Sequence, residues 1–436
     1  MTDLWLSFPA LAQDLFVLVS LLSPIAAMTL ILNRQFAVRS LVTAMLWRFR
    51  WANFTFIALI ASAIGIGTGL IAQEQGIRKG TASAADKFEL IISAPGSEMT
   101  MMLASVYLQP SDVALLDGQV YNAVANHEEV EVAAPLAFGD SYESAPIIGT
   151  TAAFGEYLSD GKIQGRSWQS PFEAIAGAAA GIVIGDRFQP SHGRGDAVEE
   201  MSHEQEFTVV GTMPRTGTPW DRAILVPVEA VWLVHGLATG HAPERAGQIG
   251  PPFDADYFPG TPAIIVKATE LWANYALHSE FNRQNETMAF FPATVLSELY
   301  RVMGDIRQAM SVMSVITQIL VAISVLLALF ILTRLFARQM ALLRAVGAPG
   351  RFLVATVWSY CATLIVSGTG LGLALGQAAA SMLSRIITQR TDILVQATLG
   401  WTELHLAAGF ASGVLLLALL PAIAVLRQPL LENLRT

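Results

Sequence analysis

The stretch that decides the fold reads Arg338-Gln339-Met340-Ala341-Leu342-Leu343-Arg344-Ala345-Val346-Gly347-Ala348. It lies between two apolar runs, 311–333 and 352–380, each long enough to cross a bilayer as a helix. The segment that joins these runs, 334–351, contains four arginines and no acidic residue. Because positively charged loops stay in the cytoplasm, we expect a short basic helix there that faces the cytoplasm.

Two further runs, 53–72 and 404–426, have the length and composition of transmembrane helices. A fifth apolar segment, 15–32, is interrupted by Pro24 within the N-terminal region 1–52. If this segment crosses the membrane, the chain has five spans, which we favour; if it lies on the surface or re-enters, the chain has four. The rest of 1–52 is a basic cytoplasmic elbow, and the tail 427–436 is also cytoplasmic. The arginines that predict a cytoplasmic position for the elbow and the tail are Arg34, Arg39, Arg48, Arg50, Arg427 and Arg435.

The charge of the chain is concentrated in its middle. The 436 residues are 53% hydrophobic and only 14% charged, yet residues 73–309 hold 30 acidic and 14 basic side chains, a formal charge of −16. This pattern predicts a polar, acidic domain inserted between the spans 53–72 and 311–333, on the side opposite the cytoplasm. An acidic surface argues against nucleic acid as a partner. The single cysteine, Cys361, excludes a disulfide within the chain.

The inserted domain opens and closes with a β-α-β pattern. Strands are expected at 88–92 and 130–134 around a helix at 112–126 capped by Ser111, and again at 263–267 and 288–291 around a helix that runs from Thr269 to 283. These units form a split core, 87–136 and 259–292, around a β-rich lobe, 137–258. Strand-like runs in the lobe are 147–149, 181–184, 207–211 and 223–226, and 236–259 reads as a loop. The fold class is a membrane helical bundle of four or five spans with a large α+β extracytoplasmic domain.

Two helical segments join this domain to its spans. Residues 73–86 continue the span 53–72, and residues 294–310 form an amphipathic helix that continues into 311–333. We expect these stalk helices to transmit motion, although they could serve only as connectors.

Small residues recur every four positions in two of the spans, a spacing that lets helices approach closely. Packing within the bundle is the simpler interpretation, and a dimer seam is the alternative. The residues are Ala61, Gly65, Gly69, Gly368, Gly372 and Gly376.

No catalytic motif emerges. The nearest approach to an ATP-binding loop, from Gly155 to Lys162, has five residues between its glycines instead of four, and Ile163 follows the lysine where Ser or Thr is required. We therefore expect no enzyme activity and no cofactor in this chain, and no catalytic residues. A metal site is not predicted either: His192 and His203, with Glu199 and Glu200, are weak candidates in a loop-like stretch.

The basic segment, with Pro349, Gly350 and Arg351 after it, resembles the coupling segment of ABC transporter permeases of the MacB/FtsX/LolC type (type VII). There the pattern is roughly Arg-Glu-Ile-Gly-Leu-Leu-Arg-Ala-Leu-Gly-Ala. The resemblance extends from residue 40 to the C-terminus and includes the stretches 88–97, 139–150, 216–223 and 421–435. Two features depart from the family: Gln339 stands where a glutamate is usual, and the segment 15–32 is additional to the four-span plan.

The resemblance implies a permease of the bacterial inner membrane whose large domain lies in the periplasm. Such permeases pair with a second copy or a paralogue and bind a cytoplasmic ATPase that holds ATP and magnesium. They relay its motion through the stalk to the periplasmic domain (mechanotransmission), for export or extraction of a substrate such as a peptide, lipoprotein or small molecule. A periplasmic adaptor or substrate-binding protein is a further possible partner. The ATPase-coupling residues would be Arg334, Arg338, Gln339, Leu342, Leu343, Arg344, Val346 and Gly347. The alternative is a signalling module that activates a periplasmic enzyme and transports nothing.

Overall fold

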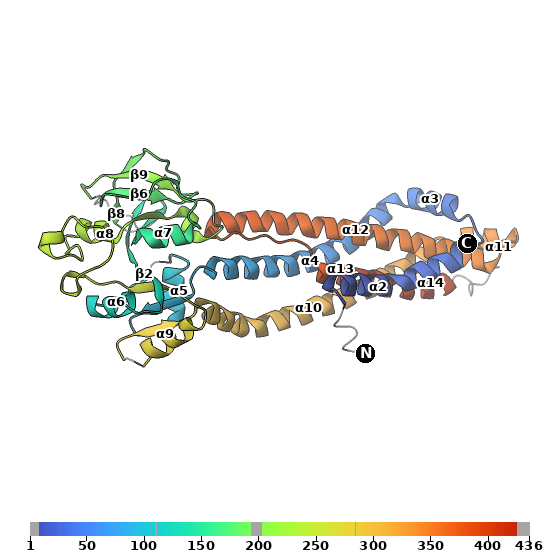
Figure 1. Cartoon of the computed structure of the whole chain (residues 1–436). Helices are drawn as coiled ribbons and strands as arrows, with labels where there is room; N and C mark the ends of the chain where they lie inside the picture. The colour runs from blue at the N-terminus through green and yellow to red at the C-terminus, as the bar shows by residue number, and fades with distance from the viewer. Residues whose placement is uncertain (1–7, 110, 193–202, 284, 425–436) are drawn as a thin grey trace. The chain divides into compact units, whose positions relative to one another are not determined.

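The computed structural model describes residues 8–109, 111–192, 203–283 and 285–424 (Figure 1). Its chain divides into two compact units. The helical unit comprises the described parts of Met1–Ile77, Asp305–Arg385 and Gln396–Thr436, and the sheet unit comprises those of Arg78–Gly304 and Ile386–Val395. The chain passes between the units four times: within the long helices α4 (Arg50–Ala85), α10 (Pro292–Leu335) and α12 (Gly350–Thr391), and once more after Val395.

The helical unit contains the helices given below, of which α4, α10 and α12 continue into the sheet unit. They are α2 (Ala10–Asn33), α3 (Arg39–Arg48), α4 (Arg50–Ala85), α10 (Pro292–Leu335), α11 (Ala337–Ala345), α12 (Gly350–Thr391), α13 (Trp401–Leu417) and α14 (Leu419–Ala424). Among the described residues, four helical segments are long and apolar enough to cross a membrane: Ala10–Asn33, Arg50–Ala85, Gly350–Thr391 and Trp401–Ala424. The predicted span 311–333 lies in α10, where Ile316–Leu327 forms a shorter apolar stretch and several side chains lie outside the described residues.

Two predicted spans have different bounds in the structure. The run 352–380 is part of the 42-residue α12, which continues to Thr391 because no helix breaker intervenes before Asp392, whose φ is +58°. The run 404–426 begins earlier, at Trp401, where the Glu403 side chain accepts a hydrogen bond (2.8 Å) from the backbone N–H of Gly400. The helix is interrupted at Ala418, three residues before Pro421, since proline removes a backbone donor and crowds the preceding turn.

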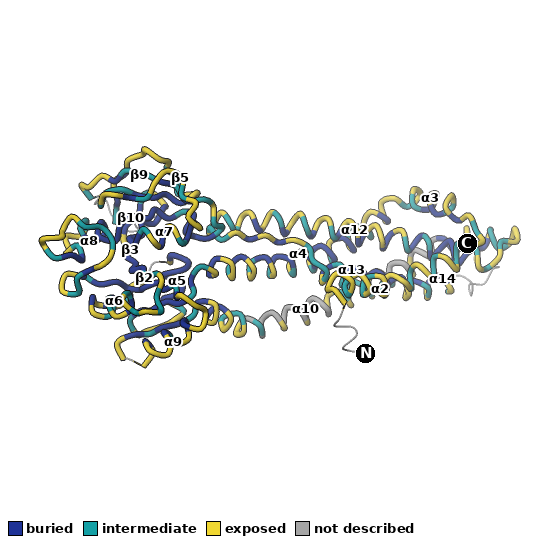
Figure 2. The backbone as a smooth tube through the Cα atoms, in the orientation of Figure 1, coloured by how far each residue is buried: buried dark blue, intermediate teal, exposed yellow. Residues whose placement is uncertain are grey.

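The N-terminal helix α2 buries none of its residues within the chain (Figure 2). It packs along α13, and the ring of His405 lies 2.9 Å from the backbone carbonyl of Asp14. Large apolar side chains on α2 remain exposed, among them Phe16, Val19 and Ile31. An exposed apolar surface of this kind is expected for a helix that faces lipid.

The sheet unit contains a four-stranded antiparallel sheet of order β12-β1-β11-β2, formed by β1 (Leu90–Ser93), β2 (Val130–Pro135), β11 (Ala263–Ala268) and β12 (Met288–Phe290). Strand β1 pairs with both C-terminal strands, with Ile92 opposite Ile264 and Ile91 opposite Phe290. In sequence order this is the 4-1-3-2 arrangement of a ferredoxin-like β-α-β-β-α-β unit. The two predicted β-α-β halves therefore interleave in one sheet.

The lobe forms a second sheet of order β5-β9-β6-β10-β4-β3-β8, with β7 paired to β9. Its strands are β3 (Ala137–Tyr142), β4 (Ala145–Thr150), β5 (Gln164–Gly165), β6 (Glu173–Ala176), β7 (Arg187–Phe188), β8 (Ser191–His192), β9 (Phe207–Thr212) and β10 (Ile224–Pro227). Helices α7 (Ala152–Leu158) and α8 (Val228–Val234) follow β4 and β10 directly. Strand β10 is completely buried, and Figure 2 shows this part of the lobe in dark blue.

Three local predictions in this unit are wrong. The helix expected at 112–126 is α6 (Gly118–Ala125), capped by Asp117 instead of Ser111, because Leu116 forms a β-bridge with Thr261. The helix expected from Thr269 is α9 (Ala273–Phe281), since the backbone N–H of Thr269 bonds to the carbonyl of Glu129.

The third error is the strand expected at 181–184. This stretch is a turn in which the carboxylate of Asp186 accepts a hydrogen bond (2.9 Å) from the N–H of Val183. A helix that was not predicted, α5 (Glu98–Ser105), is capped by Ser97, whose hydroxyl accepts from the N–H of Thr100.

Candidate functional site

The basic segment 334–351 contains a short, well-terminated helix. Helix α10 ends at Leu335, and α11 begins at Ala337. Helix α11 ends in a Schellman motif: the N–H of Ala348 bonds to the carbonyl of Leu343 (2.9 Å), and the N–H of Gly347 bonds to that of Arg344 (3.0 Å). Gly347 has a φ of +98°, a conformation that glycine adopts without steric cost. The glycine of the motif therefore fixes the length of this helix.

One face of α11 anchors it to the rest of the helical unit. Met340 and Ala341 are buried, and Met340 belongs to the same apolar cluster as Val42 and Met45 of α3. Phe336, just before α11, is also buried, and its ring packs edge-on against the rings of Phe49 and Tyr360, with centroids 4.9 and 5.4 Å away. Burial of these side chains holds α11 in a defined orientation.

The opposite face of α11 is exposed and partly apolar. Arg338, Leu342 and Val346 follow one another at intervals of four residues, so that they share one side of the helix. Leu342 is 50% exposed and Val346 is 88% exposed. Gln339 and Gly347 are also exposed, whereas Leu343 and Arg344 are half-buried. Arg334 lies in the last turn of α10, and its side chain is outside the described residues. Arg338, Leu342 and Val346 form what we call the coupling face.

Comparison with solved structures finds matches that cover about half of this chain. Two of the matching structures are extracytoplasmic domains, one of MacB and one of YknZ. The periplasmic region of MacB from Actinobacillus actinomycetemcomitans is 12% identical, with a TM-score of 0.31, and the match covers 50% of this chain and 94% of that one. The extracellular domain of the noncanonic ABC-type transporter YknZ from Gram-positive bacteria is 11% identical, with a TM-score of 0.27, covering 46% and 98%. No protein-family model and no curated protein matches the chain.

The small residues predicted to pack helices meet one another in the helical unit. A Cβ atom placed on Gly65 would lie 3.0 Å from the carbonyl oxygen of Gly372, and one on Gly376 would lie 2.9 Å from that of Gly65. A Cβ on Gly69 would lie 3.1 Å from Gly376. Gly368 faces Ile60, and Ala61 lies against Gly372. The structure therefore places these residues in one seam between α4 and α12, inside a single chain.

Hydrogen bonds hold the segment after α12 at two places along its length. In the helical unit, the side chain of Gln377 bonds to the backbone of both Ala397 (3.1 Å) and Leu399 (2.8 Å). In the sheet unit, the N–H of Leu394 donates to the carbonyl of Gly217 (2.9 Å). Gly217 lies in a loop that the carboxylate of Asp221 organises, accepting from the N–H groups of Thr216 and Gly217 at 2.7 and 2.8 Å. The loop 216–222, noted in the sequence only for its family resemblance, thus holds the end of α12.

The lobe also contains a cavity of 470 Å³ beside a buried carboxyl group. Glu229, at the start of α8, is only 1% exposed, and burial raises its pKa to about 7. Its Oε1 atom accepts a hydrogen bond from the N–H of Gly250 and lies 3.5 Å from Nε2 of His241, whose pKa burial lowers. Residues that line the cavity include Thr150, Thr151, Trp168, Glu229, Ile249 and Gly250. Sequence reasoning did not single out Glu229, because nothing in its local sequence predicts that it is buried.

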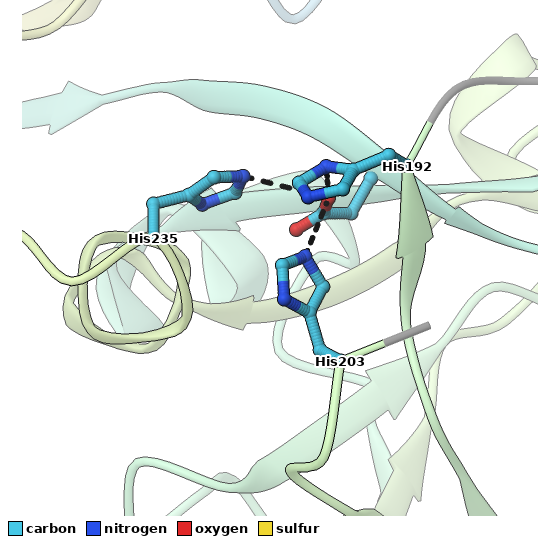
Figure 3. Close-up of side chains that lie close together, drawn as sticks. His192, His203 and His235 are labelled. Carbon is cyan, nitrogen blue, oxygen red and sulfur yellow. Dashed lines mark hydrogen bonds and ion pairs between the residues drawn. The ribbon is translucent and has the colours of Figure 1, made fainter. Parts of the chain in front are cut away.

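The two weak metal candidates lie next to each other. His192 and His203 have ring centroids 4.3 Å apart, and both lie close to Asp140 and His235 (Figure 3). Glu199 and Glu200 are outside the described residues. Asp140 and His235 were missed because they are distant in sequence and neither forms a spacing motif with the other two histidines.

Proposed function

We propose that this chain is the permease subunit of an ABC transporter, driven by a separate cytoplasmic ATPase that binds ATP and magnesium. The observation that carries the proposal is the coupling face. A helix only nine residues long is anchored by Met340 and Ala341, yet it presents Leu342 and Val346 outward beside a cationic Arg338. Exposed apolar side chains on a firmly held surface helix are typical of a docking site for another protein.

The chemistry of this face suits an ATPase surface. Each apolar side chain that becomes buried contributes roughly 1.5–3 kcal/mol, so Leu342 and Val346 would supply much of the binding energy. Arginine adds directional contacts to carboxylates. Gln339 cannot form the ionic contact that a glutamate would form, and here the apolar pair carries correspondingly more of the interaction.

Continuous helices offer a path for motion. Helix α11 lies between α10 and α12 in the chain, and both of these helices continue without interruption into segments that belong to the sheet unit. Because a hydrogen-bonded helix resists stretching and bending, displacement of α11 by an ATPase would be transmitted along α10 and α12. We infer mechanotransmission, with the sheet unit on the periplasmic side of a bacterial inner membrane, for export or extraction of a substrate met there. A second permease copy or paralogue, and a periplasmic adaptor or substrate-binding protein, would complete the assembly.

Copurification tests the proposal. The full chain is coexpressed in turn with each ABC ATPase of the same genome, and the tagged permease is purified in detergent. The expected result is a stable complex whose ATP turnover exceeds that of the ATPase alone. Failure of the two chains to associate, with both folded, would overturn the proposal.

A further inference from the structure

We propose that Asp140, His192, His203 and His235 form a binding site for a divalent transition metal, with zinc(II) as the ion that fits best. The site lies at one edge of the lobe sheet, within the sheet unit, and does not depend on the proposed transport function. Figure 3 shows the three labelled imidazole rings gathered around one carboxylate, which their ion pairs identify as that of Asp140.

Four separate elements bring these side chains together. Asp140 lies in β3 and His192 lies directly opposite it in β8, the edge strand. His203 is held near His192, because its backbone N–H donates a hydrogen bond to the carbonyl of Pro190 (2.9 Å). His235 is the C-cap of α8. A cluster built from such distant parts of the chain is not a by-product of local sequence.

The distances match the coordination shell of a small ion. Nδ1 of His192, Nε2 of His203 and Nε2 of His235 lie 3.2, 3.3 and 3.6 Å from Oδ1 of Asp140. The four candidate ligand atoms all lie within 4.8 Å of one another. In a tetrahedral site with bonds of about 2.0–2.1 Å, ligand atoms are about 3.3–3.4 Å apart. The observed spacing therefore leaves room for one ion at the centre of the cluster.

The orientation of His235 supports coordination. Its Nδ1 atom lies 2.7 Å from the backbone carbonyl of Val231. A carbonyl oxygen only accepts hydrogen bonds, so Nδ1 carries a proton, and Nε2 is the ring nitrogen that faces the cluster. Metal-binding histidines commonly donate their second ring N–H to a backbone carbonyl in this way.

The donor set selects the class of metal. Three imidazoles and one carboxylate suit zinc and neighbouring ions such as copper and nickel, whereas calcium and magnesium prefer all-oxygen sites. Asp140 is buried, but the side chains of His192 and His235 are about one-third exposed, at 33% and 29%. An ion can thus enter from the solvent, and the acidic sequence of 73–309 favours its approach.

Zinc binding by the full chain tests this proposal. The protein carries a tag without histidines, is purified in detergent, is stripped with EDTA and is titrated with zinc chloride by calorimetry, with elemental analysis of the dialysed protein. We expect one zinc per chain and a rise in melting temperature on binding. X-ray absorption should report three imidazole ligands and one oxygen ligand.

Single substitutions at two of the histidine ligands assign the site. His203→Gln and His235→Gln should each weaken zinc binding by about 100-fold or more, since loss of even an outer partner of a metal ligand costs about 10–100-fold. His278→Gln is the matched control, because His278 lies in α9 and stacks on Phe291. Circular dichroism verifies that each variant is folded. Wild-type protein that binds no zinc, or a His235→Gln variant with wild-type affinity, would overturn the proposal in favour of a metal-free ion-pair cluster.

Discussion

The guanidinium group of Arg222 lies 2.7 Å from the carboxylate of Asp392. Arg222 belongs to the lobe, and Asp392 is the first residue after α12. Both side chains are largely buried, with exposures of 29% and 14%, and Arg222 is also within 3.4 Å of the carbonyl of Gln389. This ion pair and the bond from Leu394 to Gly217 attach the end of α12 to the domain.

Loss of this ion pair should loosen the segment 392–395. In Arg222→Gln and Asp392→Asn, we expect the amide of Leu394 to exchange its hydrogen about five-fold faster or more, because a partly buried ion pair contributes on the order of 1 kcal/mol. Hydrogen exchange with mass spectrometry on the full chain measures this rate. Asparagine at 392 isolates the charge, since it tolerates the positive φ found there.

Arg187→Gln is the control for this experiment. It removes the Arg187–Glu206 pair, which is 3.1 Å long and exposed on both sides. Exchange of residues 392–395 should be unchanged in this variant. Equal exchange in Arg222→Gln and wild type would show that the ion pair does not hold the segment.

Substitutions on the coupling face should impair binding of the ATPase. Leu342→Asp and Val346→Asp each replace an exposed apolar side chain with a charge, and we expect each to weaken the permease–ATPase complex by about ten-fold or more. The affinity of the purified chains measures this effect. Leu271→Asp, at a residue 78% exposed in the sheet unit, is the matched control and should bind normally.

Met340→Ala should behave differently from the substitutions on the exposed face. The side chain of Met340 lies on the buried face of α11. Its truncation should therefore lower the melting temperature of the permease by removing apolar packing. If Leu342→Asp and Val346→Asp bind the ATPase as tightly as wild type and Leu271→Asp do, the coupling face is not the docking site.

The seam between α4 and α12 leaves no room for a methyl group at position 372. In Gly372→Ala, the new Cβ would meet Cβ of Ile64 at 2.8 Å and the carbonyl oxygen of Ala61 at 2.9 Å, so the helices must separate. Overpacking of this kind costs roughly 1–3 kcal/mol, and the melting temperature of the detergent-purified chain should fall.

Gly370→Ala provides a control on the same helix. Nothing lies within 4 Å of a Cβ at position 370, and alanine favours a helix over glycine by about 0.5–1 kcal/mol. This variant should be as stable as wild type or slightly more stable. Equal melting temperatures for Gly370→Ala and Gly372→Ala would contradict the close approach of the two helices.

Buried Glu229 should make stability depend on pH. Burial raises its pKa from 4.5 to about 7, so folding favours the protonated form. The stabilisation from protonation is present in full below pH 4.5 and is lost as the pH rises through about 7. Glu229→Gln mimics the protonated side chain, and its stability advantage over wild type should grow from pH 5 to pH 8, up to about 3 kcal/mol.

Thermal unfolding of the full chain, followed by tryptophan fluorescence at several pH values, checks this trend. Glu244→Gln, in an exposed turn of the same lobe, is the control and should show no such dependence. A melting-temperature difference between Glu229→Gln and wild type that stays constant from pH 5 to pH 8 would mean that Glu229 is not buried as described.

Much of the secondary structure follows from local patterns. The runs that became β2, β10 and β11 are short and rich in β-branched residues, so their strands were predictable. The starts of helices were less predictable. Ser111 and Thr269 have side chains that commonly cap helices. However, Leu116, just before α6, and Thr269 form backbone hydrogen bonds with distant segments, and the helices begin after them. A tertiary partner for the backbone outweighed a local preference worth about 1 kcal/mol.

The sequence by itself determined the properties that depend on neighbouring residues: the apolar helices, the basic composition of 334–351 and the acidic composition of 73–309. Only the tertiary structure decided which distant side chains meet. It alone placed His235 and Asp140 beside His192 and His203, joined Arg222 to Asp392, and buried Glu229. The physical reason is that helix period, turn type and hydropathy are encoded within a few residues, whereas burial and ligand geometry arise when strands and helices from separate parts of the chain pack together.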